Sequence, residues 1–126
     1  MINASLKRVL IAEGNDINRQ ILEDHLVFCG YEVLGIASGS NFFQALSDFQ
    51  PDLILLDLRL PDIDGYTILD EVQKRSEWQN MPVIALSASA FKADQQRLLS
   101  LGVSRYFVSP VVLTDLIQAI QAELQQ

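Results

Sequence analysis

An aspartate, Asp57, closes the most apolar short segment of the sequence. The preceding residues 53–56 form a continuous apolar run without helical spacing, which is typical of a strand buried on both faces of a parallel sheet. A carboxylate at the end of such a strand is costly to desolvate, so it should face a crevice. Ligand crevices in open α/β sheets lie at the carboxyl ends of the strands. Asp57 is therefore the first candidate for chemistry, the alternative being a polar loop that happens to contain an aspartate.

Two other polar residues occupy equivalent places in the sequence. Glu13 follows the strand-like segment 7–12, and Ser87 follows the apolar segment 83–86. Each is expected at the carboxyl end of a buried strand, where a carboxylate or a hydroxyl can face a ligand crevice. Glu13 could instead be a solvated loop acid, and Ser87 could simply satisfy a backbone group at the end of its strand.

Five strand-like segments alternate with five segments of helical periodicity. We expect strands at 7–12, 31–37, 53–56, 83–86 and 105–108, and helices at 16–29, 38–49, 66–76, 91–101 and 113–124. Such alternation predicts an α/β fold, a three-layer sandwich in which helices cover both faces of a parallel five-stranded sheet. In the strand order 2-1-3-4-5 the ends of the first and third strands are adjacent, so Glu13 should lie beside Asp57.

Several residues have expected local roles in these elements. Asp16 is expected to cap the first helix, Gly30 to follow its last residue, and Gly65 to mark the start of the third helix. Trp78, in a polar loop, is interpreted as a cover for the sheet edge. His25 has no cysteine or second histidine at metal-ligand spacing, so it is interpreted as an ordinary helix residue rather than a ligand.

The composition excludes several classes of protein. The 126 residues predict one domain spanning 1–126, and no output domain is expected to follow it. No apolar run approaches the roughly 20 residues needed to cross a membrane. The net charge is −7 without a cluster of basic residues, which argues against a nucleic-acid partner. A single cysteine, Cys29, cannot form an internal disulfide, and we expect a small core residue in a cytoplasmic protein.

Five blocks of the sequence carry a family resemblance. They are residues 9–13 (VLIAE), 18–19 (NR), 55–65 (LLDLRLPDIDG), 85–88 (ALSA) and 101–108, which contains Leu101-Gly102 before Tyr106-Phe107-Val108. By the spacing of these blocks, nearly the whole chain resembles the receiver domain of two-component response regulators. The resemblance implies a flavodoxin-like (βα)5 fold, in agreement with the predicted sheet.

The resemblance also implies a role for each candidate residue. Asp57 looks like the phosphoacceptor, Ser87 like the hydroxyl that follows the phosphoryl group, and Tyr106 like the aromatic residue that changes rotamer. Core packing remains an equally good interpretation of Tyr106. In the family Mg²⁺ is the cofactor, and the ligands implied here are Glu13, Asp57 and the backbone carbonyl of Arg59.

Two positions depart from the family pattern, and both concern charge in the pocket. The family has two adjacent acids after the first strand, whereas this chain has Glu13-Gly14. It has Lys-Pro after the fifth strand, whereas this chain has Ser109-Pro110. The two losses compensate in net charge, so a metal-free pocket can be stable. Because one carboxylate ligand is missing, we expect weak Mg²⁺ binding and impaired phosphorylation.

Two further expectations concern the basic residues near the pocket and the Ser109-Pro110 peptide bond. Arg59 and Lys92 are interpreted as solvated side chains, although either could reach the pocket mouth and supply the missing cation. The Ser109-Pro110 peptide bond is expected to be cis, as the equivalent Lys-Pro bond is in the resembling family.

The sequence thus predicts a stand-alone receiver in a two-component phosphorelay. A histidine kinase or phosphotransfer protein would phosphorylate Asp57, and a downstream protein would bind the face formed by segments 91–101, 105–108 and 113–124. The chain would not be an enzyme, beyond its own phosphorylation and dephosphorylation. The alternative is a pseudo-receiver, a binding module that works without phosphorylation. A hydrolase is disfavoured because the sequence has no nucleophile elbow, glycine-rich phosphate loop or histidine-based dyad.

Overall fold

A parallel sheet forms the centre of the structure, a computed structural model that describes residues 6–125. Its strands lie in the order β2-β1-β3-β4-β5. In chain order the elements are β1 (Arg8–Ala12), α1 (Asp16–Phe28), β2 (Glu32–Ile36), α2 (Phe42–Phe49), β3 (Leu53–Asp57), α3 (Gly65–Lys74), β4 (Val83–Ser87), α4 (Lys92–Ser100), β5 (Arg105–Val108) and α5 (Leu113–Leu124). The predicted α/β fold and the predicted strand order are confirmed.

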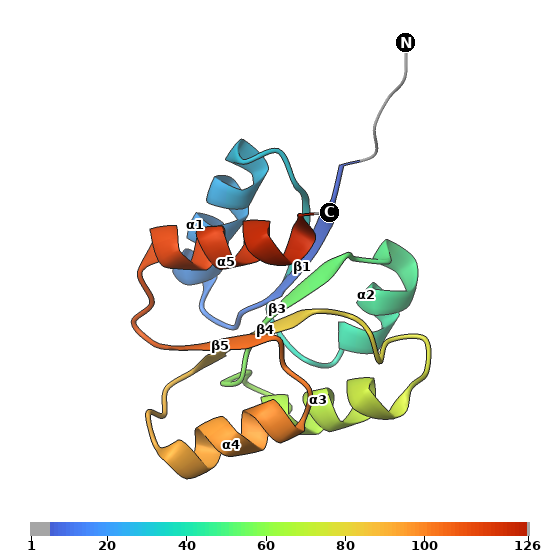
Figure 1. Cartoon of the computed structure of the whole chain (residues 1–126). Coiled ribbons are helices and arrows are strands. Elements are labelled where there is room, and N and C mark those ends of the chain that lie inside the picture. Colours follow the sequence, from blue (N-terminus) through green and yellow to red (C-terminus); the bar gives the residue numbers. More distant parts are fainter. Residues whose placement is uncertain (1–5, 126) are drawn as a thin grey trace.

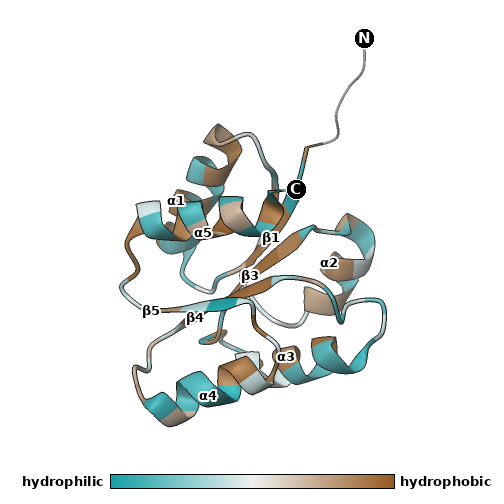
Figure 2. Cartoon of the chain, viewed as in Figure 1, coloured by the Kyte–Doolittle hydropathy of each residue, from teal (hydrophilic) through white to brown (hydrophobic). Residues whose placement is uncertain are grey.

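The helices form two layers around the sheet. Figure 1 shows α1 and α5 on one face and α2, α3 and α4 on the other. The strands are largely hydrophobic, whereas the helices combine hydrophobic and hydrophilic residues (Figure 2). A helix that covers a sheet needs an apolar stripe only on its inner side, which explains this difference.

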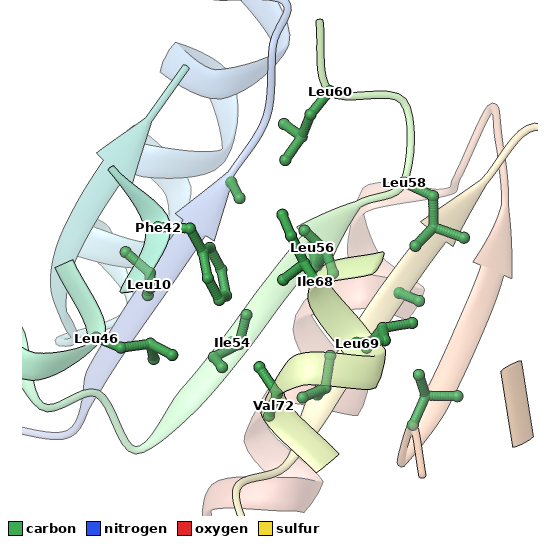
Figure 3. Packing of buried hydrophobic residues seen from close by; sticks show 14 of the residues in the cluster. Leu10, Phe42, Leu46, Ile54, Leu56, Leu58, Leu60, Ile68, Leu69 and Val72 are labelled. Carbon is green, nitrogen blue, oxygen red and sulfur yellow. The ribbon is translucent and has the colours of Figure 1, made fainter. Parts of the chain in front are cut away.

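Successive strand residues point to opposite faces of the sheet and therefore enter two separate cores. On the face covered by α2, α3 and α4, the strands contribute Leu10, Ile54 and Leu56, which pack against Phe42, Leu46, Ile68, Leu69 and Val72 (Figure 3). On the other face, Val9, Ile11 and Leu55 pack against α1 and α5 through Leu22, Leu26, Leu116 and Ile120. No helix within residues 6–125 is long and apolar enough to span a membrane.

Helix α1 differs from the sequence-based expectation in one detail at each end. Asn15, not Asp16, caps the helix, because the Asn15 side-chain oxygen accepts a hydrogen bond from the Asn18 amide at 2.9 Å. Cys29 is exposed rather than buried, since it follows the last helical residue instead of lying on the inner face. Gly30 has a φ of +96°, a conformation suited to the residue that ends a helix.

Helix α2 begins later than the sequence suggests, at Phe42 rather than Ser38. The Asp62 carboxylate accepts hydrogen bonds from the Gly39 amide at 2.7 Å and from the Ser40 amide at 2.9 Å. These amides are therefore bound to the loop after β3 and not to a helical turn.

Trp78 lies in the core cluster on the α2 side. Its ring is stacked on that of Phe43, with centroids 5.7 Å apart, and the Arg75 guanidinium lies 5.2 Å from its centroid. The loop before β4 thus covers the core next to α2.

Candidate functional site

Three buried polar side chains gather at the carboxyl ends of neighbouring strands. Glu13, Asp57 and Ser87 are 6%, 2% and 4% exposed, and they are the buried polar or charged residues among those that the structure describes. Asp57 ends β3, Ser87 ends β4, and Glu13 directly follows β1. The strand order places β3 between β1 and β4. The sheet therefore brings the three predicted residues together, with Asp57 in the middle.

Arg59 binds the Asp57 carboxylate with both its backbone and its side chain. Oδ1 accepts hydrogen bonds from the Arg59 amide at 2.8 Å and from Nε at 3.0 Å, and Oδ2 accepts one from Nη2 at 2.8 Å. Burial alone would raise the pKa of Asp57, but the hydrogen bonds from Arg59 outweigh it and hold the pKa below its usual value. Asp57 is therefore ionised at neutral pH.

The interpretation of Arg59 as a solvated side chain is wrong, and the alternative, that it reaches the pocket, is right. Its side chain is half exposed, yet the guanidinium group is anchored at two points. Besides its bonds to Asp57, Nη2 donates to the Ser109 hydroxyl at 3.1 Å. Lys92, by contrast, is exposed at the start of α4 and is not among the residues that line the pocket. The positive charge paired with Asp57 is thus that of Arg59.

Glu13 is a buried acid, so the interpretation as a solvated loop residue is wrong. Its Oε2 accepts a hydrogen bond from the Asn15 amide at 3.1 Å. Burial raises the pKa of Glu13, and the neighbouring Asp57 carboxyl raises it further. Two carboxyls in contact favour a single negative charge between them. As pH falls, Glu13 therefore takes up a proton before Asp57 does.

Two serines lie on the other side of Asp57. Ser87 is the last residue of β4, and Ser109 directly follows β5. The Ser87 hydroxyl oxygen accepts a hydrogen bond from the Ser89 amide at 3.0 Å, so it does satisfy a backbone group. Its own proton remains available for a ligand, because a hydroxyl both accepts and donates. The Ser109-Pro110 bond is cis, as predicted.

Two other residues singled out in the sequence lie away from these groups. Tyr106 is half-buried on β5 and packs against the core cluster that α4 covers, in line with its interpretation as a packing residue. The His25 ring lies on α1, with Nδ1 2.9 Å from the carbonyl oxygen of Ile21. His25 is exposed, as expected of an ordinary helix residue.

A cleft of about 230 Å³ opens over Asp57 and is lined also by Glu13, Asn15, Asn18 and Arg59. A second, larger cavity of about 490 Å³ shares Glu13, Asn18 and Arg59 with it and extends over apolar residues of α1 and of the segment after β5. Asn15 and Asn18 were not predicted from the sequence to line the cleft. Their position at the start of the helix that follows the first strand was the signal, because residues there lie at the same edge of the sheet as Asp57.

The acids at this edge that could hold Mg²⁺ are Asp57 and Glu13, and both already accept hydrogen bonds. Mg²⁺ requires near-octahedral oxygen coordination. Both oxygens of Asp57 bind the Arg59 guanidinium, and burial raises the pKa of Glu13. Within residues 6–125 no group of three or more acidic, histidine or cysteine side chains could hold a metal ion. A second acid at position 14 would have extended the set, because a Cβ on Gly14 would lie 3.8 Å from the Arg59 carbonyl oxygen.

Comparisons with known proteins identify the family of this chain. Residues 9–121 match the family model of the response regulator receiver domain. The polar-differentiation response regulator DivK of Brucella ovis is 31% identical over 118 residues, which cover 94% of this chain and 96% of DivK.

Two solved structures share the fold over almost all of both chains. A putative response regulator from Chloroflexus aurantiacus has a TM-score of 0.88 and 27% identity, covering 97% of this chain and 100% of its own. The receiver domain of the sensor histidine kinase PA1611 from Pseudomonas aeruginosa, with a magnesium ion coordinated in its active-site cleft, has a TM-score of 0.84 and 29% identity at the same coverage. The chain therefore belongs to the response regulator receiver domain family of two-component signalling.

Proposed function

We propose that this receiver accepts a phosphoryl group on Asp57 from a phosphohistidine of a histidine kinase or phosphotransfer protein. The observation that carries the proposal is an ionised carboxylate at the end of β3, beside a cleft of about 230 Å³ that is large enough for a phosphoryl group. Hydrogen bonds from Arg59 keep the pKa of Asp57 low despite its burial, so the carboxylate is nucleophilic at neutral pH. Membership of the receiver family supports the nature of the donor.

The transfer is an in-line displacement at phosphorus. A carboxylate oxygen of Asp57 forms the new bond to phosphorus while the bond from phosphorus to the imidazole nitrogen breaks. The leaving nitrogen keeps the electron pair, and because the other ring nitrogen of the phosphohistidine carries a proton, the donor is left as neutral histidine. Oδ2 is the better placed oxygen, because it accepts one hydrogen bond from Arg59 whereas Oδ1 accepts two.

Two groups of this chain can stabilise the charge on the equatorial phosphoryl oxygens. The Ser87 hydroxyl lies at the end of the neighbouring strand and can donate a hydrogen bond. The Arg59 guanidinium can move from Oδ2 to a phosphoryl oxygen, which would replace the lysine that other receivers carry at position 109. Tyr106 would then change rotamer as the switch residue.

We further propose that phosphorylation is slow and that Mg²⁺ binding is weak, for two reasons seen in the site. Gly14 offers no second acid, and Arg59 already neutralises Asp57. The chain would catalyse no reaction other than its own phosphorylation and dephosphorylation. Its output would be protein contact through α4, β5 and α5, the elements next to Ser87 and Tyr106.

The experiment is incubation with acetyl phosphate or phosphoramidate, with and without Mg²⁺, read by intact mass. We expect one phosphoryl adduct, which disappears in Asp57→Asn and persists in the control Asp70→Asn on the surface of α3. Asp70 pairs with Lys74 and is not among the residues that line the cleft.

A second candidate function is the phosphorylation-independent pseudo-receiver. The observation that favours it is the pairing of Arg59 with both oxygens of Asp57, which leaves the nucleophile occupied in the resting state. A folded wild type that gains no adduct with any donor, at any Mg²⁺ concentration, would contradict the first function and favour the second.

A further inference from the structure

We propose that Arg59 is the resident cation of the acidic pocket: its guanidinium holds the Asp57 carboxylate where a divalent metal would bind, so Mg²⁺ and Arg59 compete. The competition concerns the unphosphorylated pocket and would exist whether or not Asp57 is ever phosphorylated. This proposal goes beyond the missing acid at position 14. The main obstacle to metal binding is then the Arg59 side chain, which this chain carries, and not an acid that it lacks.

The geometry of the pair resembles metal chelation. A guanidinium presents parallel N–H groups that match both oxygens of a carboxylate. Here Nε lies 3.0 Å from Oδ1 and Nη2 lies 2.8 Å from Oδ2 of Asp57. Asp57, which would supply the first carboxylate to a metal, is thus bound through both of its oxygens by the Arg59 guanidinium. A metal that takes either oxygen must remove a hydrogen bond from Arg59.

The pair also differs from the other ion pairs of the molecule. In every other ion pair found within residues 6–125, both side chains are at least 19% exposed, whereas Asp57 is 2% exposed. Water screens the exposed pairs and leaves them weak. A buried carboxylate depends on its partner, because an uncompensated charge in this position is strongly unfavourable. Some cation must therefore accompany Asp57, and in this chain Arg59 does so.

The structure also offers a place for Arg59 when a metal displaces it. The guanidinium lies on the border of two cavities, the cleft over Asp57 and the cavity of about 490 Å³ that extends toward α5. Ser109 lines the larger cavity and already accepts a hydrogen bond from Nη2 at 3.1 Å. A rotation about the side-chain torsions would carry the guanidinium toward this cavity with the Ser109 contact as a pivot.

The test is a calorimetric Mg²⁺ titration of the wild type, Arg59→Met and Arg59→Lys. Met keeps an unbranched apolar stem and removes the charge, whereas Lys keeps the charge and removes the fork. We expect Arg59→Met to bind Mg²⁺ about tenfold more tightly than the wild type, the factor that a competing interaction of about 1.4 kcal/mol imposes. Arg59→Lys should lie between the two.

Two controls separate competition from a general effect of charge. Arg105→Met removes the same charge from a surface pair, in which Nε of Arg105 lies 2.9 Å from Glu123, and it should leave the affinity for Mg²⁺ unchanged. Adding Asp57→Asn to Arg59→Met should abolish the gain, which locates the metal at Asp57. Circular dichroism verifies that each variant is folded.

The proposal is overturned if folded Arg59→Met binds Mg²⁺ no more tightly than the wild type, or if Arg105→Met gains as much. Should Arg59→Met not fold, NMR of the wild type decides instead. The Nε–H resonance of Arg59 should shift with added Mg²⁺ while that of Arg105 stays in place, and an unchanged Arg59 resonance under saturating Mg²⁺ would contradict competition. Failure of Asp57 to accept a phosphoryl group would leave both measurements unaffected, so the two proposals fail separately.

Discussion

Glu13 and Asp57 are neighbouring acids whose pKa values move in opposite directions, and this makes Glu13 a destabilising residue at neutral pH. Burial raises the pKa of Glu13, so its ionised form is less favourable in the folded protein than in the unfolded chain. Its contribution to stability is complete at low pH and is lost as pH rises through the raised pKa. Asp57, with a lowered pKa, contributes above its usual pKa and loses that contribution as pH falls.

The first prediction is that Glu13→Gln stabilises the protein at pH 7, by about 1 kcal/mol, the usual size of a single-residue effect. Gln keeps an oxygen for the Asn15 amide and removes the ionisable group. The advantage should shrink as the pH is lowered toward about 4, where Glu13 itself is protonated. Urea unfolding of both proteins across this range measures the difference, and an advantage that does not depend on pH would contradict the argument.

The second prediction concerns the two positions that depart from the family pattern. Gly14→Asp combined with Ser109→Lys should restore Mg²⁺-dependent phosphorylation of Asp57, and each change alone should do less. Gly14 does not have a positive φ, and a Cβ there meets Pro61 Cδ at 3.1 Å, so an aspartate fits after a small shift. Groups that act on one phosphoryl group are expected to be non-additive.

The measurement is the initial rate of phosphorylation against Mg²⁺ concentration for the wild type, both single variants and the double variant. A folded double variant that is no faster than the wild type at saturating Mg²⁺ would show that these two residues do not limit the reaction. Adding Arg59→Met to the double variant then reveals whether the guanidinium still competes.

At the scale of elements, the start of α3 depends on a glycine that packs against Leu58, the first residue after β3. Gly65 is buried at the first position of α3, and its amide donates to the Leu58 carbonyl at 3.2 Å. A Cβ added at Gly65 would lie 2.6 Å from Leu58 Cα. The close approach involves backbone, so a rotamer change of a side chain cannot relieve it.

The third prediction is therefore that Gly65→Ala lowers the free energy of unfolding by about 2 kcal/mol or more, although alanine favours helices in general. Thr67→Ala, at an exposed position of the same helix, is the control and should be neutral or slightly stabilising. Denaturant unfolding of the two variants and the wild type measures this, and an unchanged midpoint for Gly65→Ala would show that the loop moves freely.

The sequence predicted the elements well where local pattern decides them, and less well where distant contacts do. Apolar runs identified the three central strands β1, β3 and β4, because a strand buried on both faces needs such a run. The start of α2 was placed too early, since the Asp62 carboxylate that holds the Gly39 amide comes from a loop 23 residues away. Arg59 was interpreted as solvated for a different reason. Its partner Asp57 is only two residues earlier, but the sequence pattern does not determine the side-chain rotamer that turns the guanidinium back to that carboxylate.

At the scale of the whole molecule, the two ends of α4 present apolar side chains to solvent. Phe91 is 76% exposed and Leu99 is 55% exposed, on the face predicted to contact a downstream protein. Such side chains are typical anchors in protein interfaces, where a few residues carry most of the binding energy.

The fourth prediction is that Phe91→Ala weakens the affinity for the downstream partner about tenfold or more, the effect of an interface hot spot. The control is Ile17→Ala, which removes an equally exposed apolar side chain from α1. Once the partner has been identified by crosslinking, titration gives both affinities. Unchanged binding by Phe91→Ala together with loss of binding by Ile17→Ala would place the contact on α1 instead.

The position of Trp78 has a practical consequence for optical experiments on this protein. It is the only tryptophan in the sequence, and it lies in the loop before β4, so the length of that strand separates it from the carboxyl-end pocket. Its indole is 8% exposed and stacked on Phe43, so its fluorescence emission should shift strongly to the red on unfolding. Ligands at Asp57 should leave that emission unchanged. Intrinsic fluorescence therefore monitors the folded population in every variant discussed above, independently of what occupies the pocket.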